Sequence, residues 1–250
     1  MAESLLIAER VTRRFGGVVA VNAASFAVAE GRITALIGPN GAGKTTLFSM
    51  ISGFLKPSAG SIRYQGEEIS GEPPHRLARR GIARTFQIVQ PFAGLTVREN
   101  IVVGAHLHQR GRIAALALAE EVGREVGLGG VLDRPADTLT VAGRKRLELA
   151  RALAIAPKLL LLDEVLAGLN PSEIRDMVPV LRALSAKGIT ILMIEHVMQA
   201  VMSLAETVFV LAEGRIIAEG RPAEVAADPH VVEAYLGRGA AERLGGTRVH

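Results

Sequence analysis

The sequence predicts an α/β fold with a parallel-sheet core, an N-terminal antiparallel β subdomain and an inserted α-helical subdomain. A short apolar run at residues 33–37 precedes a glycine-rich loop and a segment of helical spacing, which indicates a strand–loop–helix unit. Four consecutive leucines lie between Pro157 and Asp163, as is typical of a strand buried on both faces. Residues 88–156 are rich in alanine and leucine at helical spacing, which predicts the helical insertion.

The remaining elements follow from the same patterns. Residues 5–15 and 23–28 alternate apolar and polar side chains around Gly16 and Gly17, which predicts antiparallel strands joined by turns. A turn region is expected at residues 71–80. The other expected strands are 61–64, 82–86, 159–162, 189–194 and a hairpin of 208–211 with 215–218; the expected helices are 44–52, 101–108, 113–126, 144–156, 170–188 and one ending at 204.

We expect a single domain over residues 1–250, since a chain of this length can bury about three quarters of its unfolded surface. Residues 1–87 and 157–236 would form the α/β core with its β subdomain. Residues 88–156 would form the helical subdomain, and residues 237–250 a C-terminal tail.

The composition excludes several classes of protein. The sequence has no cysteine, which rules out disulfides, thiolate nucleophiles and Cys-ligated metal centres. Aromatic residues make up only 4%, so a protein that stacks single-stranded nucleic acid is not expected. The longest apolar run, residues 113–119, is too short to cross a membrane, and Glu3 lies where a secretory signal would be basic. We therefore expect a cytoplasmic protein.

Basic residues outnumber acidic residues by 29 to 25, and only five of the basic residues are lysines. Arginine suits the recognition of phosphates and acidic partners, although solvated surface charge is the simpler interpretation. Two basic clusters could suggest nucleic acid, but we favour partner docking and proximity to phosphate. The clusters are Arg76, Arg79, Arg80 and Arg84, and Arg144, Lys145 and Arg146.

The clearest motif is the glycine-rich loop, which matches GxxxxGK[ST] between a predicted strand and a predicted helix. Glycines let backbone N–H groups curl around phosphate oxygens, and the helix N-terminus adds partial positive charge. We expect Lys44 to reach the terminal phosphates and Thr45 to offer its hydroxyl to Mg²⁺. The predicted nucleotide-binding residues of this segment are Gly38, Pro39, Asn40, Gly41, Ala42, Gly43, Lys44, Thr45 and Thr46.

Polar side chains also follow three other predicted strands: Asp163 with Glu164, His196, and Gln87. Ligands of open α/β sheets bind at the carboxyl ends of the strands, so these side chains are expected to face one site. Asp163 is the predicted Mg²⁺ carboxylate, which would bind the ion directly or hold one of its ligands, and Glu164 is the predicted general base for an attacking water. A helix cap is the alternative role for either acid, and a structural role is the alternative for the histidine.

The order of these motifs resembles the ATP-binding subunit of ABC transporters over nearly the whole chain. The resemblance implies a P-loop NTPase fold with a RecA-like core that binds ATP and Mg²⁺. The glycine-rich loop would be the Walker A motif, and Asp163 and Glu164 would belong to Walker B. His196 would be the switch histidine at the γ-phosphate, and Gln87 the Q-loop residue, with a part in catalysis and in holding Mg²⁺. Phe15 stands where the family places the aromatic residue that stacks on adenine; a core position is the alternative.

The signature segment also follows from this resemblance. Residues 139–143, LTVAG, align with the LSGGQ signature of the family. By resemblance, Thr140, Ala142 and Gly143 would contact the phosphates of a nucleotide held by a partner subunit. A helix expected to open near Arg144 would direct its N-terminal dipole toward that anion.

Five positions depart from the family pattern. Val141 and Ala142 replace two signature glycines, and Gly143 replaces the signature glutamine. Val165 replaces the proline common after the catalytic glutamate, and Asn170 replaces the usual aspartate of the D-loop. Asn170, followed by proline and then by glutamate at the third helical position, also predicts a strong helix start.

Within the family, residues 84–87, 94–100 and 167–171 resemble importers of branched-chain and other hydrophobic amino acids. The resemblance implies an ATP-hydrolysing subunit at the cytoplasmic face of the inner or plasma membrane, bound peripherally. Its partners would be a second ATPase subunit, identical or different, the transmembrane permease subunits and, indirectly, an extracytoplasmic solute-binding protein; nucleic acid is not an expected partner. The alternatives are a soluble ABC ATPase acting on ribosomes or DNA, an importer subunit for urea or amides, and a module that binds ATP without hydrolysing it.

Overall fold

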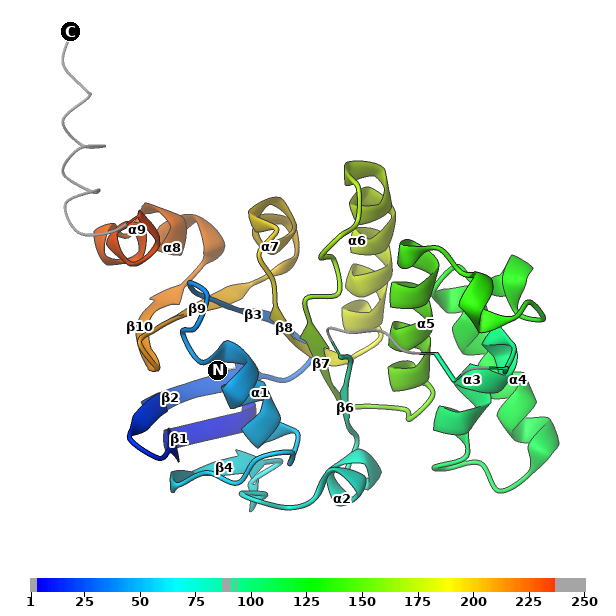
Figure 1. The fold of residues 1–250 in the computed structure, drawn as a ribbon, viewed down its shortest axis with the longest axis horizontal. Coiled ribbons are helices and arrows are strands. Elements are labelled where there is room, and N and C mark those ends of the chain that lie inside the picture. Colours follow the sequence, from blue (N-terminus) through cyan, green and yellow to red (C-terminus); the bar gives the residue numbers. More distant parts are fainter. Residues whose placement is uncertain (1–3, 87–90, 93, 237–250) are drawn as a thin grey trace, which may run out of the picture.

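The computed structural model describes residues 4–86, 91–92 and 94–236. The predicted site residue Gln87 and the predicted tail at 237–250 lie outside this part of the chain. The described residues form two β-sheets flanked by helices, with α3, α4 and α5 gathered at one end and α8 and α9 at the other (Figure 1). The observed fold class is therefore α/β, as predicted.

The larger sheet is the scaffold of the site. Its strands β6, β7, β8, β3 and β9 run parallel, and β10 pairs antiparallel at one edge. The carboxyl ends of the five parallel strands therefore meet along one edge of the sheet. In spatial order the strands are β10 (Arg215–Gly220), β9 (Thr207–Ala212), β3 (Ile33–Ile37), β8 (Thr190–Ile194), β7 (Leu159–Asp163) and β6 (Ile82–Arg84).

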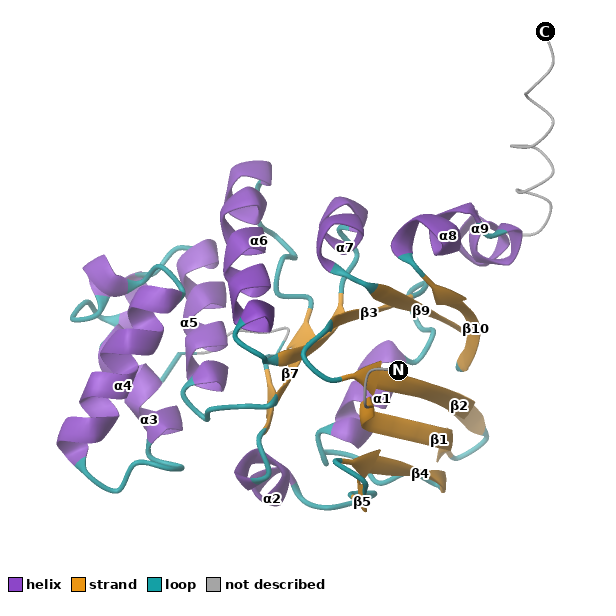
Figure 2. Cartoon of the chain, turned by 180° about the vertical axis from the view of Figure 1, so that it is seen from behind, coloured by secondary structure: helices purple, strands orange, loops and turns teal. Residues whose placement is uncertain are grey.

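The smaller sheet is antiparallel and carries the N-terminus. Its spatial order is β2 (Val18–Ala29), β1 (Ser4–Phe15), β4 (Ala59–Tyr64) and β5 (Glu67–Glu68). The β1–β2 hairpin turns at Gly16, whose φ of 55° suits glycine. This sheet lies on the opposite side of the larger sheet from α6 and α7 (Figure 2).

The helices complete the layers. The described chain contains α1 (Lys44–Ile51), α2 (Pro74–Arg79), α3 (Val97–Ala105), α4 (Arg112–Glu125), α5 (Val141–Leu153), α6 (Pro171–Ala186), α7 (Met198–Leu204), α8 (Pro222–Ala227) and α9 (Pro229–Leu236), and two short 3-10 turns, Gly129–Val131 and Ala136–Thr138. In the described residues, no helix combines the length and apolar character that a membrane span requires.

The central strands of the larger sheet, β3, β7 and β8, are buried on both faces. In β7, Leu160 and Leu162 pack with α5, α6 and α7, whereas Leu159 and Leu161 pack with α1 and the smaller sheet. All five residues of β7 are buried, which confirms the prediction made from the run of leucines. The sheet is therefore a rigid layer between two hydrophobic cores, and its edge can hold polar groups in fixed positions.

The structure differs from the sequence prediction at residues 71–80 and at the end of β6. Residues 71–80 were expected to form a turn but include α2, which starts at Pro74 and buries Leu77. The strand expected at 82–86 ends at Arg84, because the backbone N–H of Phe86 donates to the Glu148 side chain instead.

Two helices begin earlier than predicted because of their caps. The helix expected at 101–108 is α3, which begins at Val97, where Thr96 and Glu99 form a capping box. The helix expected to open near Arg144 is α5, which begins at Val141 after the N-cap Thr140.

Candidate active site

The glycine-rich loop connects β3 to α1 and packs too tightly for side chains at two positions. A Cβ atom on Gly38, where φ is +152°, would lie 2.0 Å from the Leu211 carbonyl oxygen. A Cβ atom on Gly43, where φ is +105°, would lie 2.3 Å from the Ala20 carbonyl oxygen. Glycine is therefore required at both positions by sterics as well as by backbone conformation.

Lys44 folds back onto this loop. Its ammonium donates to the carbonyl oxygens of Gly38, at 2.7 Å, and Pro39, at 2.9 Å. Burial lowers the pKa of Lys44, while the charges of Glu164 and Asp163 act in the opposite direction. The loop thus holds a buried cation beside two carboxylates.

A cavity of about 280 Å³ opens beside the loop. It brings together loop residues from one strand end with residues from two other strand ends, as predicted from the parallel arrangement. Ala20 of β2 also lines it; its backbone packs against Gly43, a contact that no sequence motif indicates. The lining residues are Ala20, Asn40, Gly41, Ala42, Gly43, Lys44, Thr45, Thr46, Glu164 and His196.

Glu164 and His196 contact each other at the wall of this cavity. Glu164 Oε1 lies 2.7 Å from His196 Nε2. Glu164 has φ of +52°, which is uncommon for a residue with a side chain, and its backbone is held by bonds to Ile194 and Lys145. Glu164 lines the cavity, whereas the buried Asp163 is not among the lining residues found in the described part of the chain.

Asp163 is almost fully buried and lies against Arg84. The carboxylate accepts a hydrogen bond of 2.8 Å from the Arg84 guanidinium, and the two side chains are 3% and 7% exposed. The backbone N–H of Asp163 donates to Thr85 Oγ1 at 3.1 Å. The sequence placed Arg84 in a basic cluster, and its ion pair with Asp163 was not predicted.

Glu195 is a second buried carboxylate that sequence reasoning missed. It follows β8, accepts a 2.9 Å hydrogen bond from the backbone of Leu166, and keeps a buried oxygen, Oε2, without a partner among the described residues. Burial raises the pKa of Glu195 to about 7. The only signal in the sequence is a carboxylate directly between a buried strand and the predicted His196.

The predicted signature residues lie apart from the cavity. Thr140 caps α5 by accepting a 3.2 Å hydrogen bond from the backbone of Gly143. The Val141 side chain is 57% exposed. In the described part of the chain, the cavity lining includes none of residues 139–143.

Phe15 is also outside the cavity lining found among the described residues. The residue is 44% exposed at the end of β1, which excludes the alternative of a core position. The Arg13 guanidinium lies 4.7 Å from the ring centroid.

The two basic clusters are largely engaged within the chain. Arg80 pairs with Glu67 and Glu72, and Arg84 with Asp163. The cations of the second cluster donate to main-chain carbonyl oxygens. Arg144 donates to Leu139 and Asp137, Lys145 donates to Glu164, and Arg146 donates to Val126. These five cations therefore have partners within the chain.

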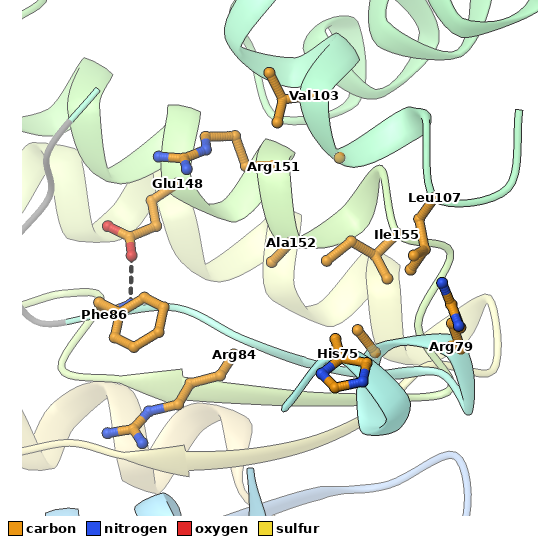
Figure 3. Close-up of a pocket in the computed structure, with 12 residues that line it drawn as sticks. His75, Arg79, Arg84, Phe86, Val103, Leu107, Glu148, Arg151, Ala152 and Ile155 are labelled. Atoms are coloured by element: carbon orange, nitrogen blue, oxygen red, sulfur yellow. Dashed lines mark hydrogen bonds between the residues drawn. The ribbon is translucent and has the colours of Figure 1, made fainter. Parts of the chain in front are cut away.

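A separate groove of about 400 Å³ lies where α2 and the end of β6 face α3 and α5 (Figure 3). Its wall is mainly apolar, with His75, Arg79 and Arg151 contributing nitrogen atoms. Glu148 accepts the Phe86 N–H in this wall, and burial raises the pKa of Glu148. Its other carboxylate oxygen, Oε2, is buried without a partner in the described structure.

Comparison with known proteins shows to which family the chain belongs. The family model described as ABC transporter matches residues 21–167, which include the glycine-rich loop, β7 and Glu164. The chain belongs to this family. A second model, described as branched-chain amino acid ATP-binding cassette transporter, matches residues 215–241.

Curated relatives match the cassette over almost its whole length. The high-affinity branched-chain amino acid transport ATP-binding protein BraF of Pseudomonas aeruginosa is 40% identical, over 95% of this chain and 99% of that protein. LivG of Escherichia coli, which bears the same description, is 36% identical with the same coverage.

Solved structures agree with the fold. A nucleotide-free ATP-binding cassette from an ABC transporter superposes with a TM-score of 0.86 at 34% identity, covering 94% of this chain and all of that one. An ATP-binding cassette in its ADP conformation gives a TM-score of 0.85 at 34% identity, with coverage of 95% and 100%. The fold is thus that of an ABC ATPase with a P-loop core.

Proposed function

We propose that this cassette hydrolyses ATP to drive an importer of branched-chain aliphatic amino acids. The observation that supports it most directly is the cavity in which the glycine-rich loop, Glu164 and His196 meet. The match of residues 215–241 to the branched-chain cassette model and the names of the relatives support the solute class.

The loop suits a triphosphate in its chemistry. Its two crowded glycines let the loop backbone pack against Leu211 and Ala20, and the N-terminus of α1 favours an anion at the cavity. The Lys44 ammonium already lies at the loop, bound to carbonyl oxygens that an anionic phosphate would replace as its partner. Asn40 to Thr46 would bind the phosphates, and Phe15, exposed on β1, would stack on the adenine ring.

The available oxygen donors fit Mg²⁺. This ion takes few protein ligands and keeps water and phosphate oxygens, so a hydroxyl and one carboxylate suffice. Thr45 lines the cavity at the start of α1, and Asp163 ends β7. We assign both to the ion, with Gln87 as a further ligand. Bound Mg²⁺ would neutralise the charge that develops on the transferred phosphoryl group.

Hydrolysis needs a base and a group that orients it. Glu164 would accept the proton of the attacking water, and His196, 2.7 Å away, would hold its carboxylate and contact the terminal phosphate. Gln87 would help to place the water. The backbone bonds of Glu164 keep this carboxylate at the cavity rather than in the core.

One chain provides only half of each site in this proposal. Thr140, Ala142 and Gly143 lie at the start of α5, away from the cavity of their own chain. In a head-to-tail dimer they would face the nucleotide of the partner, where the N-terminus of α5 favours phosphate. ATP between the two cassettes would then hold the dimer closed.

The groove between α2 and α5 would receive the membrane-spanning subunits. Its apolar wall and nitrogen-bearing rim suit a short amphipathic segment of a permease. Docking there would place the cassette peripherally at the cytoplasmic face of the membrane. An extracytoplasmic solute-binding protein would deliver the amino acid to the permease.

The first experiment tests nucleotide chemistry in the purified chain. Lys44→Ala is expected to weaken binding of a fluorescent ATP analogue at least about tenfold, because the buried cation is lost. Glu164→Gln is expected to keep ATP affinity but lose hydrolysis and accumulate as a dimer with ATP. Lys158→Ala, at the opposite end of β7, is the control and should match the wild type. Hydrolysis at the wild-type rate by Glu164→Gln would refute the assignment of the base.

The second experiment tests the solute. The cassette is co-expressed with its permease and binding protein, and uptake of labelled leucine, valine, urea and acetamide is measured in wild type and Glu164→Gln. Leucine and valine uptake that is lost in the variant supports the proposal. Uptake of urea or acetamide alone, or co-purification with ribosomes and no permease, would refute the solute class.

A further inference from the structure

Arg84 connects Asp163 with the helix that follows the phosphate loop. It is the last residue of β6, in register with Leu161 of the neighbouring β7. Its guanidinium donates to Asp163 Oδ2 at 2.8 Å, and both side chains are almost completely buried. A buried ion pair is costly unless the remaining donors are also bound, so the other partners of the guanidinium matter. Both terminal nitrogens have partners, whereas Nε is buried without one among the described residues.

Those partners are Ser49, which lies within α1, and Ser52, which is the C-cap residue of the same helix. Nη1 of Arg84 donates to Ser49 Oγ at 3.1 Å and to Ser52 Oγ at 3.0 Å, while Nη2 is on Asp163. Ser49 Oγ in turn donates to the Thr45 carbonyl oxygen at 2.7 Å. A continuous set of hydrogen bonds therefore joins Asp163 to Thr45, the two residues to which we assign Mg²⁺ oxygens.

The planar guanidinium is well suited to this position. It offers several donors in a fixed fork, so one group can hold a carboxylate and two hydroxyls at once. The rings of Phe48, Phe54 and Phe86 surround it, with centroids 5.4 to 5.9 Å from the guanidinium carbon. The aromatic surroundings restrict the side chain to one place, so the carboxylate it holds is also restricted.

We propose that Arg84 is a positioning residue that fixes the Asp163 carboxylate relative to Thr45, and thereby sets the Mg²⁺ affinity of the nucleotide site. This inference rests on the proposed function, since it concerns the same ion. Arg84 acts through Asp163 and contacts neither nucleotide nor water in this proposal. Partners that orient a metal ligand typically change metal affinity by about 10- to 100-fold when removed.

The test measures how much Mg²⁺ strengthens nucleotide binding. Affinity for a fluorescent ATP analogue is determined in EDTA and at a series of Mg²⁺ concentrations. Arg84→Lys keeps the charge but loses the fork, and is expected to leave affinity in EDTA unchanged while raising the half-saturating Mg²⁺ concentration at least about tenfold. The double variant Ser49→Ala, Ser52→Ala keeps the ion pair but removes two hydrogen bonds to the guanidinium. It is expected to raise the half-saturating Mg²⁺ concentration about threefold.

Arg80→Lys is the matched control for Arg84→Lys. Arg80→Lys alters an arginine that pairs with two carboxylates at the surface, and should behave as the wild type. Circular dichroism checks that each variant is folded, and the double serine variant serves if Arg84→Lys does not fold. Unchanged or lower half-saturating Mg²⁺ in folded variants would overturn the inference. Absence of Mg²⁺-dependent binding in the wild type would instead refute the proposed function.

Discussion

Replacing Glu195 with glutamine should stabilise the folded chain at neutral pH, and by an amount that depends on pH. The wild-type carboxylate is buried at the end of β8, and burial raises its pKa from 4.5 to about 7. Ionising this carboxylate in the folded chain therefore costs about 3 kcal/mol more than in the unfolded chain. Glutamine has the same shape and no charge, so it avoids this cost.

The direction of this pH dependence follows from how tightly the folded and unfolded chains bind the Glu195 proton. Between pH 4.5 and 7 the folded chain holds the Glu195 proton more tightly than the unfolded chain does, so wild-type stability falls as pH rises through this window. Above pH 7 both states are ionised and this contribution is constant. The free-energy advantage of Glu195→Gln is therefore expected to grow by about 3 kcal/mol between pH 4.5 and 8, then level off.

Urea unfolding followed by circular dichroism at intervals between pH 5 and 8.5 measures this directly. Glutamine can still accept from the Leu166 N–H, which donates to Glu195 at 2.9 Å, so the loop before α6 should remain in place. Glu219→Gln, at an exposed position of β10, is the control and should give a curve parallel to that of the wild type. A parallel curve for Glu195→Gln as well would show that the carboxylate is not the source of the cost.

Two further predictions concern the loop and the signature. Gly38→Ala should lower the free energy of unfolding by about 3 kcal/mol, because the new Cβ would lie 2.0 Å from the Leu211 carbonyl oxygen. Gly66→Ala, at a position with positive φ but no neighbour within 4 Å, should lower it by only about 1 kcal/mol. Equal losses for the two variants in thermal unfolding would contradict the steric argument. Thr140→Ala removes the acceptor for the Gly143 N–H and should cost about 1 kcal/mol in urea unfolding, and no loss would show that the cap contributes nothing.

The elements with strong local signals were predicted well. The run of leucines is β7, and the apolar run before the loop is β3. Asn170 caps α6 in the predicted capping box. The turn at Glu213 and Gly214 joins β9 to β10, with positive φ at both residues. These features depend on neighbours within a few residues, which is why the sequence alone reveals them.

One missed boundary depends on a contact between distant residues, and another on a local cap. The strand at residues 82–84 is shortened because Glu148, far along the chain, takes the Phe86 N–H. The Ala- and Leu-rich pattern places the start of α5 at Arg144, whereas the local cap at Thr140 makes the helix begin at Val141.

By itself, the sequence determined the fold class, the glycine-rich loop and the strand ends that carry Asp163, Glu164 and His196, because motif spacing and strand periodicity are local properties. Only the tertiary structure decided how those side chains are held: Glu164 on His196, and Asp163 on Arg84. Burial and hydrogen-bond partners depend on which distant segments pack together, and a linear pattern of residue types does not specify those contacts.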